Sequence, residues 1–362
     1  MRALLGFLLL SLSFPLSAAR GWVVTSDADD GPGTLRAALL EANAVCKGDE
    51  PCTITFFDHP EILPKTIFLR TPLPVVTACE LTIRSVRRPP DLPDFTWGIN
   101  GSALTSGDGL AFRPSCDGNR IEVDGLTVTS FPGDGIAAYG PAPLFYTFTR
   151  LSISGRSRGI AIEAWNSDFN ITHSTIGNTS RSAITLWGAR RTVIANVRIG
   201  VSERGDTLPV GASGVFVGPD GGNVTVLQSL VSNARDFGLA LAYGNARMTI
   251  SDVFMTANKA GDVDWGLDGP SSHPDVPATP RIFSATYDSV RNVTHIVTEP
   301  GVHVFSSTTL TLFLNAHLER FAGVAGTNGI VEAPGDLRGR YVSGYRTEIG
   351  LVSEVSPAVL VR

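Results

Sequence analysis

The sequence predicts an all-β fold, a right-handed parallel β-helix, and the repeat that fills its centre carries the prediction. A dipeptide of glycine and an aliphatic residue returns at intervals of 26, 24, 24, 31, 24 and 24 residues, with Ala or Asp once each in the place of glycine. A period of this length is typical of repeat architectures. The seven copies are Gly109-Leu110, Gly135-Ile136, Gly159-Ile160, Ala183-Ile184, Gly214-Val215, Gly238-Leu239 and Asp262-Val263.

Each repeat also contains three short stretches in which apolar residues alternate, and turn residues separate them. Alternation with a period of two predicts strands that bury one face. In the third repeat the pairs are Ile160/Ile162, Phe169/Ile171 and Ser174/Ile176. Three strands make one coil, and stacked coils pair equivalent strands about 4.8 Å apart. A solenoid of helices is the alternative, but its apolar spacing of i, i+3 and i+4 is missing.

One repeat is longer than the others, and the surplus lies within residues 202–212. Insertions in solenoids form loops on one face, which is often the binding face. A neutral surface insertion is the alternative, because long loops are tolerated at little free-energy cost.

The N-terminal region reads as a cap for the open end of the coil. Residues 22–26 form a strand pattern, residues 27–33 a turn, and Thr34 an N-cap for a helix over residues 35–44. One face of that helix is apolar and predicts a lid, since a solenoid must cover its ends. We assign residues 20–107 to the cap and first coils, and residues 108–266 to the β-helix. The apolar face holds Leu35, Ala38, Leu39 and Ala42.

The cap segment resembles a known family. Residues 24–43, VTSDADDGPGTLRAALLEAN, resemble the N-terminal signature of exported bacterial right-handed β-helix repeat proteins with the pectate-lyase-like superfold. The CSLREA-type proteins are a related set, and their Cys-Ser-Leu-Arg-Glu-Ala stands here as Gly-Thr-Leu-Arg-Ala-Ala, without the cysteine. The resemblance runs from about residue 22 to 265. It implies the cap and the scaffold, and no particular reaction.

Beyond the coils, residues 267–280 form a Pro-rich linker and residues 281–362 contain several short strands. Short strands separated by turns over about 80 residues are typical of a small β-sandwich. Residues 339–343 and 352–359 resemble the last strands of the immunoglobulin-like modules that follow such β-helices. The alternative is that these strands are further capping strands of the solenoid.

The N-terminus predicts export. Arg2, the apolar run 3–14 and Ser17-Ala18-Ala19 match the three parts of a signal peptide over residues 1–19. The apolar run is too short to span a bilayer, and an uncleaved anchor is the alternative. We therefore expect a secreted or cell-surface protein without a transmembrane segment.

The four cysteines fit export and lie in the N-terminal third of the chain. Four cysteines allow three pairings, of which we favour Cys46–Cys52 with Cys79–Cys116. They then act as disulfide staples of the cap. The spacing of a zinc site is missing.

Composition and motifs exclude several function classes. The net charge is −5 and no basic stripe occurs, which argues against nucleic acid as a partner. No motif predicts a metal or another cofactor. Asp262 and Asp264 are two residues apart and could bind Ca²⁺ or act as acid and base, but a solvated edge that blocks further strand pairing is the commoner role of such a pair.

The outward positions of the first strand of each coil suggest a carbohydrate site. Tyr139, Glu163 and Trp187 occupy equivalent positions on successive coils, beside a row of mostly small residues that we expect to be flat. Trp165 and Tyr243 lie slightly further along their strands. Aromatic rings on a flat surface suit stacking with sugars. Packing of the same rings against neighbouring turns is the alternative.

We therefore expect a glycan-binding or adhesion scaffold that acts on an extracellular polysaccharide or cell-surface glycan. The alternative is a polysaccharide lyase or glycoside hydrolase that works on the same face. The Asn-Thr-Asp, Asp-Asp and Gly-His-Gly motifs of polygalacturonases and the Trp-Ile-Asp-His motif of pectate lyases are absent from the sequence. Three or more acids gathered beside Tyr139 and Trp187 would favour the enzyme.

Overall fold

The computed structural model describes residues 20–48, 50–57, 65–85, 97–114, 116, 120–140, 144–242, 244–266, 277–310, 315, 317–348, 351–353 and 355–362. The predicted signal peptide, most of the predicted linker and Tyr243 lie outside the described residues.

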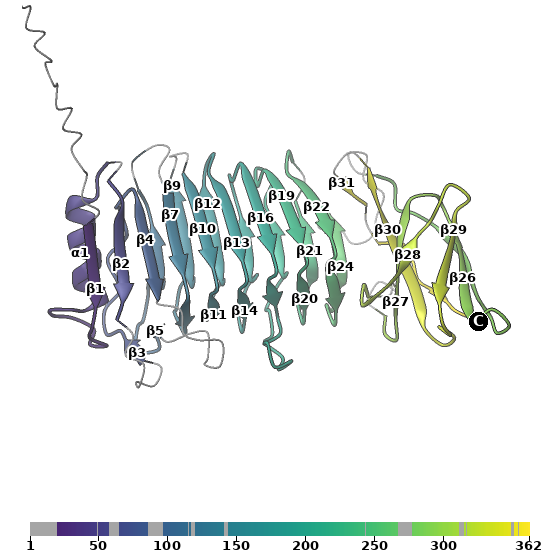
Figure 1. Cartoon of the computed structure of the whole chain (residues 1–362), viewed down its shortest axis with the longest axis horizontal. Helices are drawn as coiled ribbons and strands as arrows, with labels where there is room; N and C mark the ends of the chain where they lie inside the picture. Colours follow the sequence, from purple (N-terminus) through teal and green to yellow (C-terminus); the bar gives the residue numbers. More distant parts are fainter. Residues whose placement is uncertain are drawn as a thin grey trace, which may run out of the picture.

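The centre of the molecule is a stack of coils that contribute strands to three parallel sheets (Figure 1). The first sheet contains β6 (Leu110–Phe112), β9 (Ile136–Gly140), β12 (Ile160–Ala164), β15 (Ile184–Leu186), β18 (Val215–Val217), β21 (Phe237–Leu241) and β24 (Gly261–Trp265). The second sheet contains β1 (Arg20–Val24), β2 (Cys52–Phe56), β4 (Leu81–Ser85), β7 (Arg120–Asp124), β10 (Phe145–Thr149), β13 (Asp168–Thr172), β16 (Arg191–Ala195), β19 (Asn223–Leu227) and β22 (Arg247–Ser251). The third sheet contains β3 (Lys65–Phe68), β5 (Trp97–Asn100), β8 (Leu126–Thr129), β11 (Ser152–Ser154), β14 (Thr175–Gly177), β17 (Arg198–Ile199), β20 (Leu230–Ser232) and β23 (Phe254–Thr256).

The register of the coils follows the sequence repeat. Ile160 pairs with Ile136 on one neighbouring coil and with Ile184 on the other. All three side chains are fully buried, so like residues form an aliphatic ladder along the axis. The predicted parallel β-helix is confirmed.

The recurring glycines have a steric cause. Each one lies at the start of a strand of the first sheet, directly before the strand or, for Gly238, at its second residue. A Cβ on Gly135 would lie 2.8 Å from the carbonyl oxygen of Gly159 on the next coil and 2.4 Å from a methyl group of Ile153. Gly159 and Gly238 meet equivalent neighbours one coil further along. At these glycines a side chain would clash with the next coil. Ala183 is the exception, since it carries a methyl group at the same repeat position.

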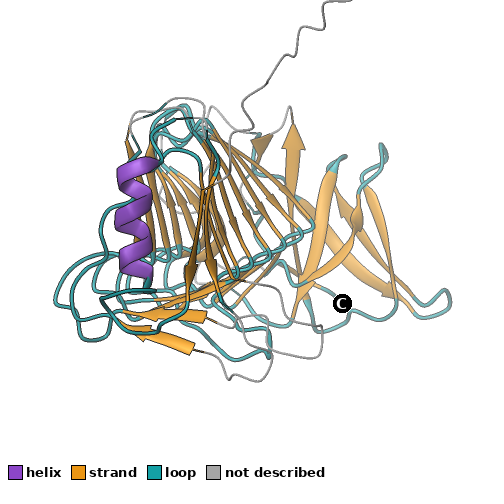
Figure 2. Cartoon of the chain, turned by 60° about the vertical axis from the view of Figure 1, so that its left-hand side comes forward, coloured by secondary structure: helices purple, strands orange, loops and turns teal. Residues whose placement is uncertain are grey.

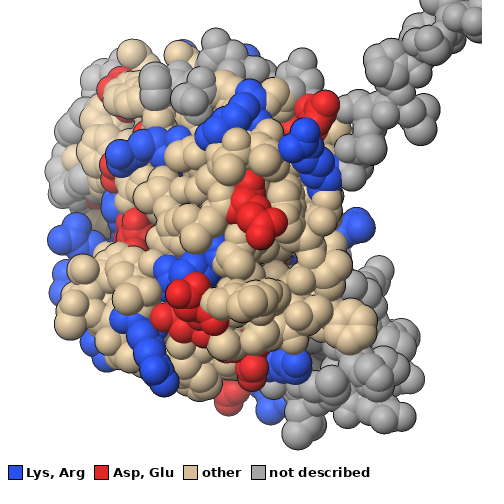
Figure 3. Space-filling model, turned by 90° about the vertical axis from the view of Figure 1, so that its left-hand side faces the viewer, with Lys and Arg blue, Asp and Glu red and all other residues tan. Residues whose placement is uncertain are grey.

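The N-terminal end is closed by α1 (Leu35–Val45), which lies across the first coil as the sequence predicts (Figure 2). The Thr34 hydroxyl caps it by accepting a hydrogen bond from the Ala37 N–H, and its apolar face is buried. Arg36 donates hydrogen bonds to Asp29 and to the carbonyl oxygens of Thr71 and Pro72, which ties the helix to two loops. On the surface of this end, basic and acidic side chains are interspersed (Figure 3).

Two disulfides reinforce this region. Cys46 is bonded to Cys52 and Cys79 to Cys116, which confirms the favoured pairing. The first joins the end of α1 to β2, and the second joins the loop before β4 to residues after β6. Both lie near the N-terminal end of the stack.

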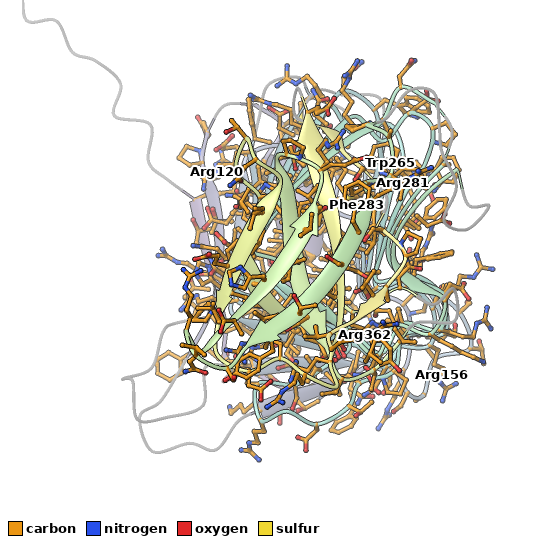
Figure 4. The ribbon with its side chains drawn as sticks, turned by 90° about the vertical axis from the view of Figure 1, so that its right-hand side faces the viewer. Arg120, Arg156, Trp265, Arg281, Phe283 and Arg362 are labelled. Carbon is orange, nitrogen blue, oxygen red and sulfur yellow. A yellow bond between two sulfur atoms is a disulfide. The ribbon has the colours of Figure 1, made fainter. Side chains whose placement is uncertain are left out.

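The C-terminal region is a small antiparallel β-sandwich, and Figure 4 shows it in front of the coils. One sheet contains β25 (Ile282–Asp288), β26 (Val293–Thr298) and β29 (Ile330–Pro334). The other contains β27 (Val302–Ser307), β28 (Arg320–Val324), β30 (Tyr341–Glu348), β31 (Leu351–Val352) and β32 (Val359–Leu360). We call this region the C-terminal module. It has a core of its own, which includes Ile296, Val304, Val331 and Val342.

The module also closes the last coil. Four of its residues belong to the same buried cluster as the coil interior: Phe305, Leu318, Tyr345 and Val355. The Met255 N–H donates to the Leu318 carbonyl at 3.0 Å, so the segment around Leu318 satisfies the edge of the third sheet. The sequence left two alternatives for this region, a separate sandwich or a cap for the solenoid. The module is both, because it has its own core and also covers the last coil.

The expectation of a solvated edge at Asp262 and Asp264 is wrong, because both residues are buried. Asp262 is 2% exposed and Asp264 is 0% exposed. The Asp262 carboxylate accepts hydrogen bonds from the Leu318 N–H at 2.8 Å and the Asn258 amide at 3.1 Å, and one of its oxygens lies 3.0 Å from His317 Nδ1. Asp262 stands where the other repeats have glycine or, once, alanine, and its strand β24 is the last of the first sheet.

The insertion, residues 202–212, projects from the stack of coils and begins shortly after β17 of the third sheet. Val201 and Thr207 form an antiparallel bridge at its base, and Val210 re-enters the column between Thr179 and Ala234. Pro209 forms one wall of a shallow polar pocket whose other lining residues are Ser130, Ser154, Gly155, Arg156, Asn178, Thr179 and Ser180. The insertion thus shapes the surface without disturbing the register.

Candidate functional site

The structure places Tyr139, Glu163 and Trp187 side by side on the outer face of the first sheet. Glu163 pairs with Tyr139 in the register of β12 and β9. Ile162 pairs with Leu186, so Trp187 follows one position beyond on the next coil. Trp165 lies two residues after Glu163, beyond the end of β12. The role of these residues in binding stays a prediction.

The row of small residues beside this column is not an exposed flat surface, which corrects the sequence expectation. Ala137, Ala161 and Ala240 are fully buried although they point away from the coil interior. On the coil of Ala137, the Tyr139 hydroxyl reaches back to Asp108 Oδ2 at 3.3 Å. Because Asp108 precedes the strand of the preceding coil, the tyrosine ring crosses the outer face of the sheet beside Ala137.

Tyr139 belongs to a cluster of carboxylates around one arginine. Arg158 donates to Asp134 through Nε at 3.0 Å and through Nη2 at 2.7 Å, and to Glu163 through Nη1 at 3.1 Å. Asp108 accepts a hydrogen bond from the Asp134 N–H at 2.8 Å as well as from Tyr139. We call Asp108, Asp134, Tyr139, Arg158 and Glu163 the carboxylate–arginine cluster.

The environment of this cluster changes its acidity. Burial, with the nearby charge of Asp134, raises the pKa of the Asp108 carboxyl above its ordinary value, although hydrogen bonds oppose the shift. Burial and the charge of Asp108 likewise raise the pKa of the Tyr139 hydroxyl. Burial would lower the pKa of Arg158, but hydrogen bonds to Asp134 and Glu163 outweigh it and raise the pKa. The cluster thus combines a weakened acid with a fixed cation.

Two indole rings lie next to the cluster and rest on glycines of the following coil. A Cβ on Gly188 would lie 2.7 Å from Trp165 Cδ2, and a Cβ on Gly218 would lie 2.4 Å from Trp187 Cε3. Trp165 is nevertheless 51% exposed and Trp187 37% exposed. Each ring is therefore supported by backbone while much of its surface remains open to solvent. We call these two rings the indole platform.

Charged side chains border the platform where the first sheet turns into the second. Arg190 and Arg191 both donate to Asp168 Oδ2 at 2.6 Å. The hydrogen bond from Arg190, followed by that from Arg191, holds the pKa of Asp168 at about 2 although burial opposes the shift. Both arginines stay more than half exposed.

Sequence reasoning missed Asp108, Asp134 and Arg158. They occupy one repeat position, directly before the recurring glycine, and are charged on three successive coils, whereas the next two coils carry Ser182 and Ser213. That regularity is visible in the sequence and would have found them. Their convergence with Glu163 requires the folded side chains, because Tyr139 and Arg158 cross between coils.

In the described part of the chain, no group of three or more His, Cys, Asp or Glu side chains has the arrangement that could hold a metal ion. No helix among the described residues is long and apolar enough to cross a membrane.

The comparison with known protein families agrees with the architecture. Residues 109–270 match the family described as "Right handed beta helix region". Two solved structures are similar: ORF18 of Geobacillus virus E2, with 10% identity, 93% of this chain and 76% of that chain covered and a TM-score of 0.36, and pectate lyase Pel9A, with 14% identity, 72% and 84% covered and a TM-score of 0.32. No curated protein sequence matches the chain. Over residues 109–270, the chain therefore has the fold of a right-handed parallel β-helix.

Proposed function

We propose that this protein binds a polysaccharide outside the cell, through the outer face of the first sheet. The observation that carries the proposal is the indole platform. Pyranose rings have apolar faces that stack on aromatic rings, and two large rings are held in place here with their surface open. The neighbouring Glu163 and Arg158 supply an acceptor and donors for sugar hydroxyls.

The extracellular setting is part of the proposal and is supported by the two disulfides, because such bonds form and persist in oxidising compartments. A rigid β-helix that displays a glycan site on one face suits adhesion to a cell wall or matrix.

The test is a binding screen with plant, algal and bacterial polysaccharides. The double variant Trp165→Ala/Trp187→Ala is expected to weaken binding about tenfold or more, because each ring contributes on the order of 1 kcal/mol. Phe68→Ala is the matched control, since Phe68 is an exposed aromatic residue on the third sheet. Equal losses in both variants, or no polysaccharide bound by the native protein, would contradict the proposal.

A second candidate function, cleavage of the bound polysaccharide, is favoured by the carboxylate–arginine cluster. Three carboxylates gather beside Tyr139, and three or more acids beside Tyr139 and Trp187 are the arrangement that would favour an enzyme. Glycosidases need one carboxyl group with a raised pKa as the acid and a second carboxylate as base or nucleophile. Asp108 has the raised pKa, and Glu163 is the more exposed carboxylate of the cluster.

The two functions separate in the variants Asp108→Asn and Glu163→Gln. A binding protein keeps most of its affinity in both variants and releases no sugar before or after the change. An enzyme that uses these groups keeps its affinity and loses turnover. Analysis of the products by chromatography distinguishes the two outcomes.

A further inference from the structure

A groove runs along the side of the coils away from the first sheet, at the corner where the second sheet turns into the third. It crosses three successive coils and is lined by the residues at the end of one strand and the start of the next. We call it the corner groove and define it by Asn196, Arg198, Gln228, Leu230, Asp252 and Phe254. None of these residues belongs to the first-sheet face.

The corner is made by one residue per coil with a positive φ. Asn196 has a φ of 55°, Gln228 of 46° and Asp252 of 52°. This conformation lets the chain turn sharply, and it favours glycine or asparagine. Gly125 occupies the same corner near the start of the stack with a φ of 75°. The turn alone therefore does not explain the longer polar side chains at the later coils.

Those side chains are exposed, and most have no partner within the protein. In the described part of the chain, the structure gives no hydrogen bond or ion pair to the side-chain amides of Asn196 and Gln228 or to the guanidinium of Arg198. Arg150 lies at the same corner, two coils before Asn196. Its guanidinium instead donates a hydrogen bond to Asp124. Free donors and acceptors are thus gathered along the groove.

The backbone of the groove is already satisfied. The N–H groups of Asn196 and Gln228 donate to Leu227 and Ser251 on the next coil at 3.2 and 3.0 Å, and the Phe254 N–H donates to Ser229 at 2.9 Å. A peptide that binds as an added strand needs main-chain N–H and C=O groups that are free to pair with it. Here these main-chain groups already pair with the neighbouring coils. Recognition in the groove must run through side chains.

We propose that the corner groove binds a linear, neutral oligosaccharide that lies along the axis of the β-helix. The repeat of about 4.8 Å between coils presents one polar side chain after another to a polymer. Leu230 and Phe254, which is 44% exposed, supply apolar surface for the faces of the sugar rings. One cation, Arg198, and one anion, Asp252, balance each other, so a charged polymer gains no net attraction.

The groove ends at the C-terminal module. Asp252 acts electrostatically on His303 and Tyr345, whose rings are stacked 5.1 Å apart in the module. Burial lowers the pKa of His303, with Asp252 opposing the shift. An oligosaccharide in the groove therefore extends from the module toward the middle of the stack.

The experiment is calorimetric titration of the full chain with cellohexaose, xylohexaose, mannohexaose and chitohexaose, and with hexagalacturonate as the charged comparison. The Trp165→Ala/Trp187→Ala variant lacks the indole platform and is expected to retain binding of at least one neutral hexasaccharide. The Asn196→Ala/Gln228→Ala variant is expected to lose that retained binding by about tenfold or more.

Asn223→Ala is the matched control, because Asn223 is an exposed polar residue on the same coil as Gln228 and lies outside the groove. Phe254→Ala is a second groove variant with the same expected loss, and circular dichroism verifies that each variant is folded. The proposal is overturned if the variant without the indole platform binds none of the neutral sugars, if the groove variants bind as tightly as the control, or if hexagalacturonate alone binds. Because the platform is absent from that variant, failure of the groove is distinguished from failure of the first-sheet site.

Discussion

The two ends of the β-helix are closed in different ways. At the N-terminal end, α1 covers the first coil with the apolar residues Leu35 and Leu39, and disulfides fasten the neighbouring loops. At the C-terminal end, the module adds apolar contacts but is fixed by a buried polar group, Asp262, together with Asn258 and His317. The N-terminal lid is thus mainly apolar and covalent, whereas the C-terminal contact is directional.

The difference follows from what each end exposes. A helix has no free main-chain donors along its sides, so it can cover an apolar interior but cannot extend a sheet. The segment around Leu318 is irregular, so its main-chain groups are free to accept a hydrogen bond from Met255 and to donate one to Asp262. Directional hydrogen bonds fix the position of the C-terminal module on the last coil. The apolar helix needs only a shape that fits the first coil.

The largest loss of stability is expected from a substitution in the middle of the stack, away from both ends. Ile160→Asp would place a carboxylate without a partner in the aliphatic ladder and is expected to lower the free energy of unfolding by several kcal/mol. Thermal unfolding measures the loss, with Thr225→Asp on the outer face of the second sheet as the control. Unchanged melting of Ile160→Asp would contradict the inward assignment of the ladder and show that the ends alone hold the stack.

The next effect concerns the C-terminal end. Asp262→Ala leaves the Leu318 N–H and its neighbours without an acceptor, and is expected to cost about 2–5 kcal/mol. We expect hydrogen exchange to rise in residues 281–362 and β24, with α1 unchanged. Glu319→Gln, which alters a more exposed bond to Thr256, is the control. Equal protection in the variant and the native protein would show that apolar contacts suffice to hold the module.

Reduction tests the N-terminal end. Breaking a disulfide typically removes about 2–4 kcal/mol of stability, and both bonds lie before residue 117. We expect reductant to increase hydrogen exchange in residues 20–57 and 65–85 far more than in the later coils. A uniform increase across residues 210–260 would contradict a local role.

The smallest effect is a pH dependence at Asp29, beside α1. Burial would raise the pKa of Asp29, but hydrogen bonds from Arg36 and the Arg70 N–H outweigh it and lower the pKa below its ordinary 3.8. The carboxylate therefore stabilises the folded state above about pH 4, and this contribution is lost as the pH falls through the lowered value. The melting temperature of Asp29→Asn should lie below that of the native protein at pH 6 and approach it near pH 2. A difference that persists at pH 2 would assign the effect to packing.

Much of this structure could be predicted from local patterns in the sequence. The spacing of Gly159-Ile160 and its equivalents predicted the coils and their register, and Thr34 predicted the start of α1. The cysteine pairing was favoured from proximity in the chain. In the module, the several short strands predicted over residues 281–362 are present, but which strands pair with one another was not predicted. Antiparallel strands in a small sandwich lack the repeat that made the coils legible.

The candidate site was predicted only in part. Tyr139, Glu163, Trp165 and Trp187 were selected because outward positions follow from a period of two. Asp108 and Asp134 were missed, since they stand in turns where no strand pattern directs attention to them. The buried state of Ala137 could not be derived from its position, because it depends on the path of the Tyr139 ring across the sheet.

The sequence by itself determined which residues point into the coils. The alternation of apolar residues and the 24-residue period are local properties that recur in each repeat. The tertiary structure alone decided what covers the outer faces and the ends. Asp262 shows the reason: its position in the repeat predicts an edge, and its burial depends on His317 and Leu318, which lie 55 and 56 residues later. Contacts between segments so far apart leave no periodic mark in the sequence, because they are made once.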